Sequence, residues 1–187
     1  MNDGHAKHAA PGELELVRQF LNTRDVEEGI DEIGDPESLR AWLAANDLAA
    51  APGLGTTDVE RAAAMRESLR ALTFANNGEP LEAGAVTALN SLAADARLLV
   101  RFDDHGHTVL EPAGEGGEAA LAELLAIVFR SMAEGSWTRL KACRDANCQW
   151  AFYDRSKNRS ATWCSMEVCG NRAKARAYRQ RRRSATS

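Results

Sequence analysis

The fold of this chain is decided at residues 143–148, which read CRDANC, and at residues 164–169, which read CSMEVC. These two segments hold all four cysteines of the 187-residue chain, in the spacing C-x4-C-x15-C-x4-C. Two close pairs separated by a short stretch are how a chain encloses one tetrahedral zinc ion with four thiolates. The sequence therefore predicts one structural zinc ion, and its predicted ligands are Cys143, Cys148, Cys164 and Cys169.

The predicted zinc site is closed, because four thiolates leave no coordination position open for a catalytic water. We therefore expect no enzyme, and the sequence contains no Ser/His/Asp arrangement, phosphate loop or dinucleotide fingerprint. Two rival interpretations of the cysteines are a set of buried free thiols and a redox-sensing site that loses zinc on oxidation. The remaining alternative is an enzyme whose active site lies in the first 135 residues, and a ligand pocket lined by convergent polar groups there would support it.

The composition, 44% hydrophobic and 27% charged, is typical of a soluble globular protein. No apolar run approaches the roughly 20 residues that span a bilayer, and residues 1–11 are polar and lack the apolar core of a signal peptide. We therefore expect a cytoplasmic protein. Thiols stay reduced there, which favours metal ligands over disulfides for clustered cysteines.

The formal net charge of −4 conceals a strong asymmetry along the chain. Residues 139–183 hold 13 Lys and Arg against 3 Asp and Glu, whereas the rest of the chain holds 10 against 24. Nucleic acid attracts such a basic segment through counterion release. The candidate nucleic-acid-binding residues are Arg155, Lys157, Arg159, Arg172, Lys174, Arg176, Arg179, Arg181, Arg182 and Arg183. The alternatives are a solvated cationic tail and docking on the acidic part of this chain or on an acidic protein.

Two residues directly after the last cysteine are candidates for particular roles. Arg172 stands on the first turn of the expected C-terminal helix, where it can reach a base edge or phosphate, or pair with a carboxylate inside the zinc module. Asn171 is a candidate to support the metal site by hydrogen-bonding a zinc-bound sulfur or the hairpin backbone.

Apolar residues at helical spacing predict a mostly helical N-terminal part. Asp35-Pro36-Glu37 marks one helix start, Thr57 and Glu60 form a capping box at another, and Asn76-Asn77-Gly78 ends that second helix. An Ala/Pro/Gly linker occupies residues 49–55. The expected helices are 13–22, 36–46, 57–75, 81–95 and 117–134.

A change of period at residue 97 predicts two strands, 97–102 and 107–111, joined by the turn Asp103–Gly106 into a β-hairpin. The helix over 117–134 follows. It directs Leu121, Leu124, Leu125, Val128 and Met132 to the core, and Gly135-Ser136 ends it at a domain junction.

The segment after residue 138 predicts a small zinc fold. Trp150, Phe152 and Tyr153 alternate in part like a strand, Asp154–Ser160 is the polar turn of a hairpin, and a helix begins near Gly170. A cysteine pair, a hairpin and a pair at a helix start form a treble-clef-like order. The expected class is α+β, with a disordered start (1–12), a helical domain with a hairpin (13–135), a zinc finger with a basic helix (138–183) and a tail (184–187).

The segment Cys143-x4-Cys148-Gln149-Trp150-Ala151-Phe152-Tyr153-Asp154-x-Ser156, followed by Trp163-Cys164-Ser165-Met166-x2-Cys169-Gly170-Asn171-Arg172-x-Lys174, resembles the CGNR zinc finger. The N-terminal part resembles the usual companion of that finger, the ABATE domain, through Phe20-Leu21-Asn22-Thr23-Arg24 and the order helix, hairpin, helix. This resemblance implies a bacterial, stress-linked transcriptional regulator that binds DNA. The N-terminal domain would then supply self-association, effector sensing or partner binding. The alternative is a protein-interaction adaptor whose basic finger docks on an acidic partner.

Overall fold

Residues 8–48 and 53–184 are described by a computed structural model of the chain. The α-helices in this part are α1 (Leu14–Asn22), α2 (Pro36–Ala45), α3 (Thr56–Asn76), α4 (Ala83–Asp95), α5 (Gly117–Ala133) and α6 (Asn171–Ser184). The strands are β1 (Arg24–Asp25), β2 (Ile30–Asp31), β3 (Leu98–Phe102), β4 (Thr108–Pro112), β5 (Leu140–Ala142) and β6 (Ala151–Tyr153). A 3-10 turn, η2 (Trp137–Arg139), and a π turn, η3 (Met166–Gly170), complete the described elements.

The strands form three antiparallel two-stranded sheets, β1–β2, β3–β4 and β5–β6. The predicted class is confirmed, since helices dominate, strands occur only as short hairpins, and a helix follows the four-cysteine segment. The β1–β2 hairpin was not expected from the sequence. Its strands are two residues long, which is too short for an alternating pattern to be visible.

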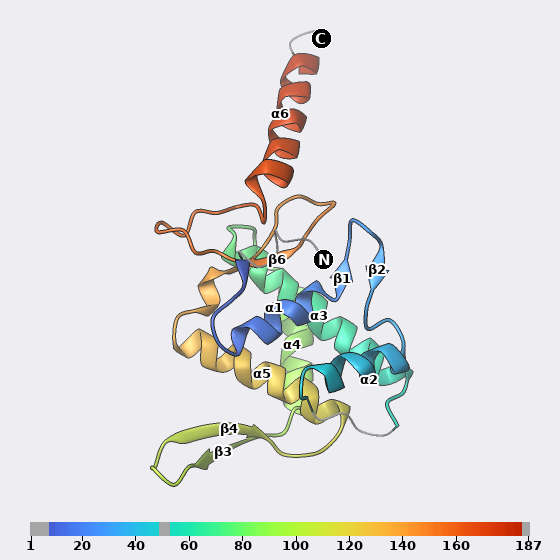
Figure 1. Ribbon diagram of the computed structural model, residues 1–187, viewed down its shortest axis with the longest axis vertical. Coiled ribbons are helices and arrows are strands. Elements are labelled where there is room, and N and C mark those ends of the chain that lie inside the picture. The colour runs from blue at the N-terminus through green and yellow to red at the C-terminus, as the bar shows by residue number, and fades with distance from the viewer. Residues whose placement is uncertain (1–7, 49–52, 185–187) are drawn as a thin grey trace.

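Helix α3 lies at the centre of the molecule (Figure 1) and contacts α1, α2, α4, α5 and β5. Its buried side chains include Met65 and Leu69, as the apolar stripe predicts. Phe20 from α1, Leu124 from α5 and Leu140 from β5 are fully buried in the same cluster. The β5–β6 hairpin is therefore part of the main hydrophobic core, although it belongs to the segment that carries the cysteines.

The start of α2 agrees with the sequence, and the start of α3 does not. The Asp35 carboxylate accepts hydrogen bonds from the backbone N–H groups of Glu37 (2.9 Å) and Ser38 (3.0 Å). The capping box expected at Thr57 and Glu60 is wrong, because the N-cap of α3 is Gly55, two residues before Thr57. Asp58 instead accepts a hydrogen bond of 2.8 Å from the N–H of Gly55.

Two details of the later helices also differ from expectation. Helix α4 begins at Ala83, and Leu81 before it is 52% exposed. In α5, Met132 is 45% exposed, and Ile127 takes a buried position instead. The apolar stripe of α5 therefore ends earlier than the spacing indicates, because the last turn buries Ser131 and turns Met132 toward solvent.

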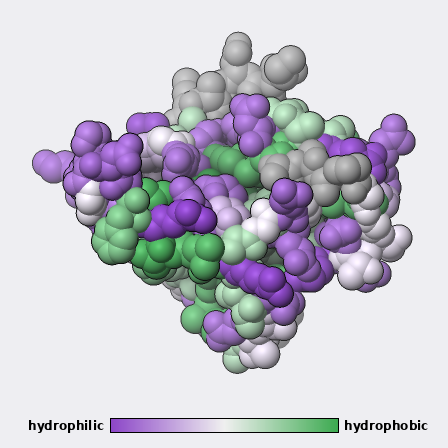
Figure 2. All heavy atoms as spheres, turned by 90° about the horizontal axis from the view of Figure 1, so that it is seen from below, coloured by the Kyte–Doolittle hydropathy of each residue, from purple (hydrophilic) through white to green (hydrophobic). Residues whose placement is uncertain are grey.

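The two ends of the molecule are chemically different. Helix α6 projects from one end, and the β3–β4 hairpin lies at the other (Figure 1). A view onto the hairpin end shows apolar side chains gathered on one side among hydrophilic ones (Figure 2). Among the described residues, none of the helices is long and apolar enough to cross a bilayer.

Part of the expected disordered start (residues 1–7), part of the expected linker (49–52) and residues 185–187 lie outside the described residues. Within the described part of that start, Ala10 is buried, and its N–H donates to the Glu15 carboxylate at 2.7 Å.

Candidate metal centre and basic helix

The four cysteine sulfurs come together at the base of α6. All four ligand atoms lie within 4.8 Å of one another. The sulfur of Cys164 lies 3.5 Å from that of Cys148 and 3.8 Å from that of Cys169. Four sulfurs placed about 2.3 Å from one tetrahedral zinc ion are about 3.8 Å apart. The four cysteines are therefore positioned to bind one metal ion, as predicted, and the donor set suits structural zinc.

The thiol chemistry also favours a cation. Hydrogen bonds from Cys148 and Cys164 lower the pKa of Cys143 to about 2. The same contacts with Cys143 raise the pKa of Cys148 and of Cys164, while burial raises that of Cys169. The cluster alone therefore favours a single thiolate. A divalent cation at its centre allows all four sulfurs to ionise.

The first cysteine pair lies at the tip of the β5–β6 hairpin. Cys143 directly follows β5, and its N–H donates to the carbonyl of Trp150 at 2.9 Å. The carbonyl of Asp145 accepts from the N–H of Cys148 (2.8 Å) and of Gln149 (3.0 Å), which turns the chain back toward β6. The expected order, a cysteine pair followed by a separate hairpin, is wrong. The hairpin encloses the first pair, and residues 154–160 form a loop rather than a hairpin turn.

The second cysteine pair is held by the π turn η3 that leads into α6. Ser165 caps this turn through its side-chain oxygen, which accepts from the N–H of Val168 at 3.2 Å, and through its carbonyl, which accepts from Gly170 at 3.0 Å. The Asn171 amide donates to the carbonyl of Glu167 at 2.9 Å. Asn171 thus supports the backbone that carries Cys169. Its contact with a sulfur stays a prediction.

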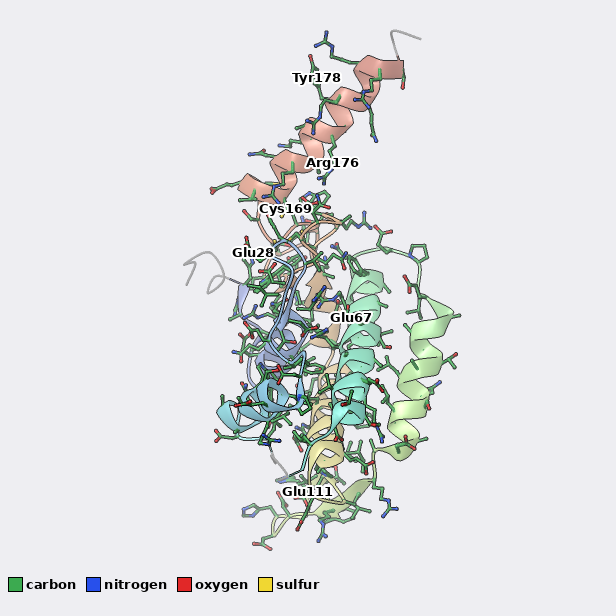
Figure 3. The ribbon with its side chains drawn as sticks, turned by 90° about the vertical axis from the view of Figure 1, so that its right-hand side faces the viewer. Glu28, Glu67, Glu111, Cys169, Arg176 and Tyr178 are labelled. Carbon is green, nitrogen blue, oxygen red and sulfur yellow. The ribbon has the colours of Figure 1, made fainter. Side chains whose placement is uncertain are left out.

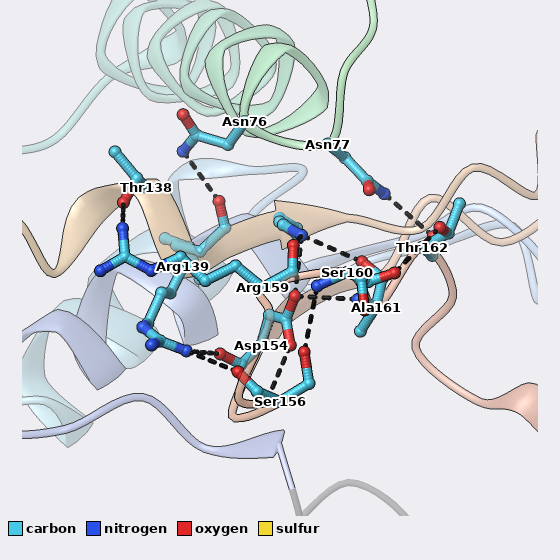
Figure 4. Close-up of polar contacts among 12 residues, drawn as sticks. Asn76, Asn77, Thr138, Arg139, Asp154, Ser156, Arg159, Ser160, Ala161 and Thr162 are labelled. Atoms are coloured by element: carbon cyan, nitrogen blue, oxygen red, sulfur yellow. Dashed lines mark hydrogen bonds and ion pairs between the residues drawn. The ribbon is translucent and has the colours of Figure 1, made fainter.

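The loop between the two cysteine pairs is fixed by a buried ion pair. The ammonium of Lys141, on β5, donates to the Asp154 carboxylate at 2.8 Å and to the carbonyls of Arg159 (2.6 Å) and Ala161 (3.1 Å) (Figure 4). Asp154 in turn accepts from the N–H groups of Ser156 (2.9 Å) and Ala161 (3.0 Å). These contacts fold residues 154–161 back onto β5, so that the chain reaches Cys164 beside the first pair.

Asparagines of the N-terminal part clamp the hairpin that carries the first cysteine pair. Asn22 donates to the carbonyl of Ala151 (2.9 Å) and accepts from its N–H (2.7 Å), in the manner of a neighbouring strand. Asn77 donates to the carbonyl of Ala142 at 2.8 Å and to that of Thr162 at 2.9 Å, and Figure 4 shows the second of these contacts. The sequence marked Asn22 and Asn77 as helix-ending residues. The structure adds that they join the metal centre to the core.

Helix α6 carries seven Lys and Arg residues and no Asp or Glu, and none of its residues is buried. Figure 3 shows Cys169 at its base and Arg176 and Tyr178 farther out along the projecting helix. Two of the basic residues near the base are ion-paired. Arg172 contacts Glu27 of the β1–β2 turn at 2.6 and 3.0 Å, and Arg176 lies 3.2 Å from Asp145. These hydrogen bonds from Arg172 lower the pKa of Glu27. The carboxylate partner of Arg172 therefore comes from the N-terminal part and not from the zinc module.

The three loop candidates lie on the surface beside the hairpin, away from α6 in the sequence. Arg155 donates to the carbonyl of Ala9 at 2.8 Å, and its guanidinium lies 5.8 Å from the ring centre of Tyr153. Arg159 is exposed, with a long contact of 3.4 Å to the Thr138 hydroxyl, and Lys157 is exposed. Their role in nucleic-acid binding stays a prediction.

Two family models match the chain. The ABATE model, described as "Putative stress-induced transcription regulator", matches residues 14–135 and so more than half of the chain. The chain belongs to the ABATE family. The CGNR zinc finger model matches residues 139–182, which contain the four cysteines and most of α6. The resemblance seen in the sequence is therefore confirmed for both segments. A comparison with curated proteins gave no match.

Sequence reasoning missed two arginines of the ABATE segment, although both lie on the central helix α3. Arg66 is 3% exposed and contacts both carboxylate oxygens of Asp31, at 2.7 and 2.8 Å. Arg70, also 3% exposed, donates to the carbonyl of Gln149 at 2.9 Å. The hydrogen bonds from Arg66 hold the pKa of Asp31 below its usual value. One signal in the sequence could have indicated that both arginines are buried. Arg66 and Arg70 lie four residues apart, each directly after a residue of the buried apolar stripe, Met65 and Leu69.

A cleft of about 760 Å³ separates the CGNR finger from the β1–β2 turn. Its lining includes the carboxylates of Asp25, Glu27, Glu28 and Glu167, beside the indoles of Trp150 and Trp163. The β1–β2 side of this cleft is therefore acidic, and phosphates are disfavoured there. Figure 3 shows Glu28 close to the level of Cys169, below the basic helix.

Proposed function

We propose that the chain is a zinc-dependent DNA-binding transcription regulator of the cytoplasm, which holds DNA with α6. The observation that supports this most is the exposed helix α6 itself, with seven Lys and Arg and no acid, projecting from the end of the molecule. A side chain with a positive charge on such a helix can approach a phosphate without displacing protein around it. The zinc ion, held by the four cysteines, would fix the base of α6 and supply no chemistry of its own.

The proposal places the phosphates along the outer part of α6. Arg172 and Arg176 already contact carboxylates near the base, and the β1–β2 side of the base is acidic. The other cations of the helix are Lys174, Arg179, Arg181, Arg182 and Arg183, and the Arg182 guanidinium lies 6.0 Å from the ring centre of Tyr178. Because each neutralised phosphate adds about 0.9 to the salt slope, five contacts predict a slope of about −4.5 for log K against log salt.

A salt titration of the zinc-loaded full chain on duplex DNA tests the proposal. Arg179→Gln combined with Arg181→Gln should make the slope shallower by about 1.8. Arg40→Gln combined with Arg97→Gln removes the same charge from residues outside the finger and should leave the slope unchanged. Absence of binding at low salt, or equal slopes for the α6 variant and the control, would contradict DNA binding by α6.

A protein-interaction adaptor is the second candidate, and the pairing of Arg172 with Glu27 favours it, since α6 already binds carboxylates of this chain. An acidic partner protein would extend that pairing along the helix. A pull-down of a stable protein complex that survives nuclease treatment, and that the α6 variant loses, would support the adaptor over the DNA-binding regulator.

A further inference from the structure

The β3–β4 hairpin lies at the end of the molecule opposite α6 (Figure 1), and its two edges differ. The ladder pairs Val100 with Leu110 and Phe102 with Thr108. Just beyond its ends, the N–H of Asp103 donates to the carbonyl of His107 at 2.9 Å. Bonded pairs alternate in an antiparallel ladder, so the odd-numbered residues of β3 bond to β4. The backbone groups of Leu98, Val100 and Phe102 therefore point away from β4.

The outer edge of β4 is covered by α5. Arg130 on that helix donates to the carbonyl of Leu110 at 3.3 Å, and α5 packs against β4. The outer edge of β3 pairs with no strand among the described residues, since the sheet has two strands. β3 is thus an unprotected edge strand, the kind of edge that other chains pair with.

The side chains along this edge are apolar. Leu98, Val100 and Phe102 share one face of the hairpin, and Val100 is 64% and Phe102 72% exposed. Figure 2 looks onto this end of the molecule, where apolar surface is exposed. Natural edge strands usually carry charges or proline at such positions, and β3 has neither at these three.

We infer that two copies of the chain associate through β3, paired antiparallel about a two-fold axis at Val100. In this register Val100 faces the partner's Val100, and Leu98 faces the partner's Phe102. Each of these residues directs its free backbone groups toward the other strand. The result is a four-stranded sheet, which is more stable than an isolated hairpin.

The register also explains why a second copy, rather than an unrelated chain, fits this edge. The pattern is self-complementary, since apolar residues oppose apolar residues on one face. On the other face Arg101 opposes the partner's Leu99, so like charges are not placed opposite each other. Arg101 already has a carboxylate neighbour, Glu111, at 3.3 Å.

Dimerisation through β3 does not depend on the proposed DNA binding. The dimer does affect how the two α6 helices are presented to DNA. Since α6 lies at the end of each copy remote from the hairpin (Figure 1), both basic helices of the dimer lie away from the β3 interface. If α6 binds DNA, the dimer therefore carries two DNA-binding helices that its interface leaves uncovered. This consequence rests on the proposed function, whereas the dimer itself is measured without DNA.

Sedimentation equilibrium of the zinc-loaded full chain across a concentration series tests the dimer. Wild type should dimerise, and Val100→Lys should weaken association at least tenfold, because two ammonium groups would face each other at the axis. Leu81→Lys, on an equally exposed leucine before α4, is the matched control and should dimerise like wild type. A monomeric wild type, or equal association of both variants, would overturn the inference.

A cysteine pair checks the register. Hydrogen-bonded antiparallel residues have Cα atoms about 5.5 Å apart, which suits a disulfide. Val100→Cys should therefore cross-link on mild oxidation. Leu99→Cys lies about 8 Å from its symmetry mate in this register and should not. Wild type, with its four metal-site cysteines, controls for other disulfides. Cross-linking of Leu99→Cys in preference to Val100→Cys would rule out pairing about Val100.

Discussion

Replacing Lys141 by methionine should weaken the link between the core and the metal centre. The Lys141 side chain is 5% exposed, and its ammonium uses all three of its N–H donors, on Asp154, Arg159 and Ala161. Methionine fills the space of the lysine stem but leaves the Asp154 carboxylate, 0% exposed, without its counter-ion. Removing one partner of a buried ion pair costs about 3–5 kcal/mol. We expect about 3 kcal/mol, because Asp154 keeps two backbone donors.

Urea unfolding at pH 7, followed by tryptophan fluorescence together with bound zinc, measures the loss. Lys157→Met, an exposed lysine of the same loop, is the matched control and should change the unfolding free energy by less than about 0.5 kcal/mol. In a double-mutant cycle with Asp154→Asn, the double variant should lose about 2 kcal/mol less unfolding free energy than the sum of the losses in the two single variants. A loss below about 1 kcal/mol for Lys141→Met, or additive effects, would refute a stabilising role for the pair.

The pH dependence of this effect has a definite sign. Although burial opposes it, the contacts of Asp154 with Lys141 and Ser156 lower its pKa in the folded protein. A lowered carboxyl pKa contributes stability above the unfolded value of about 3.9, and this contribution is lost as the pH falls through the folded pKa. In Lys141→Met, protonation of the Asp154 carboxylate removes the buried charge that has lost its counter-ion. The difference between wild type and variant should therefore shrink as the pH falls from 7 into the acid range, where Asp154 protonates in the variant before it does in wild type.

Glu27→Gln should make the DNA salt slope of the zinc-loaded chain steeper by about 0.9, since it frees one arginine of α6 for phosphate, whereas Glu28→Gln should not. An equal effect of both would indicate a general loss of negative charge. Cys164→Ser should abolish zinc binding, while hydrogen exchange should find the amide of Ala151 still protected, because that amide is bound to the core. Arg66→Met should cost about 1.5–3 kcal/mol in thermal unfolding, because its buried guanidinium donates hydrogen bonds to two charged carboxylates. A melting temperature like that of wild type would contradict this.

Much of the metal centre could be predicted from the sequence, because zinc ligation by four cysteines depends on residue type and spacing. The basic helix α6 was predictable for the same reason, since charge and helical propensity are local. The position of the first pair, at the tip of a hairpin, was not. β5 is three residues long, which is too short for a strand pattern to be visible in the sequence. Its residues are buried because α3 packs against them.

The sequence by itself determined which residues can hold a metal, which segments are helical and where positive charge gathers. Only the tertiary structure decided what these features contact. Asn22 meets Ala151 across 129 residues, and Arg172 meets Glu27 across 145. Such pairings leave no periodicity in the chain, because they depend on how α1, α3 and the finger pack together. The cysteine spacing therefore predicts a zinc module, whereas tertiary packing places the hairpin of that module in the protein core.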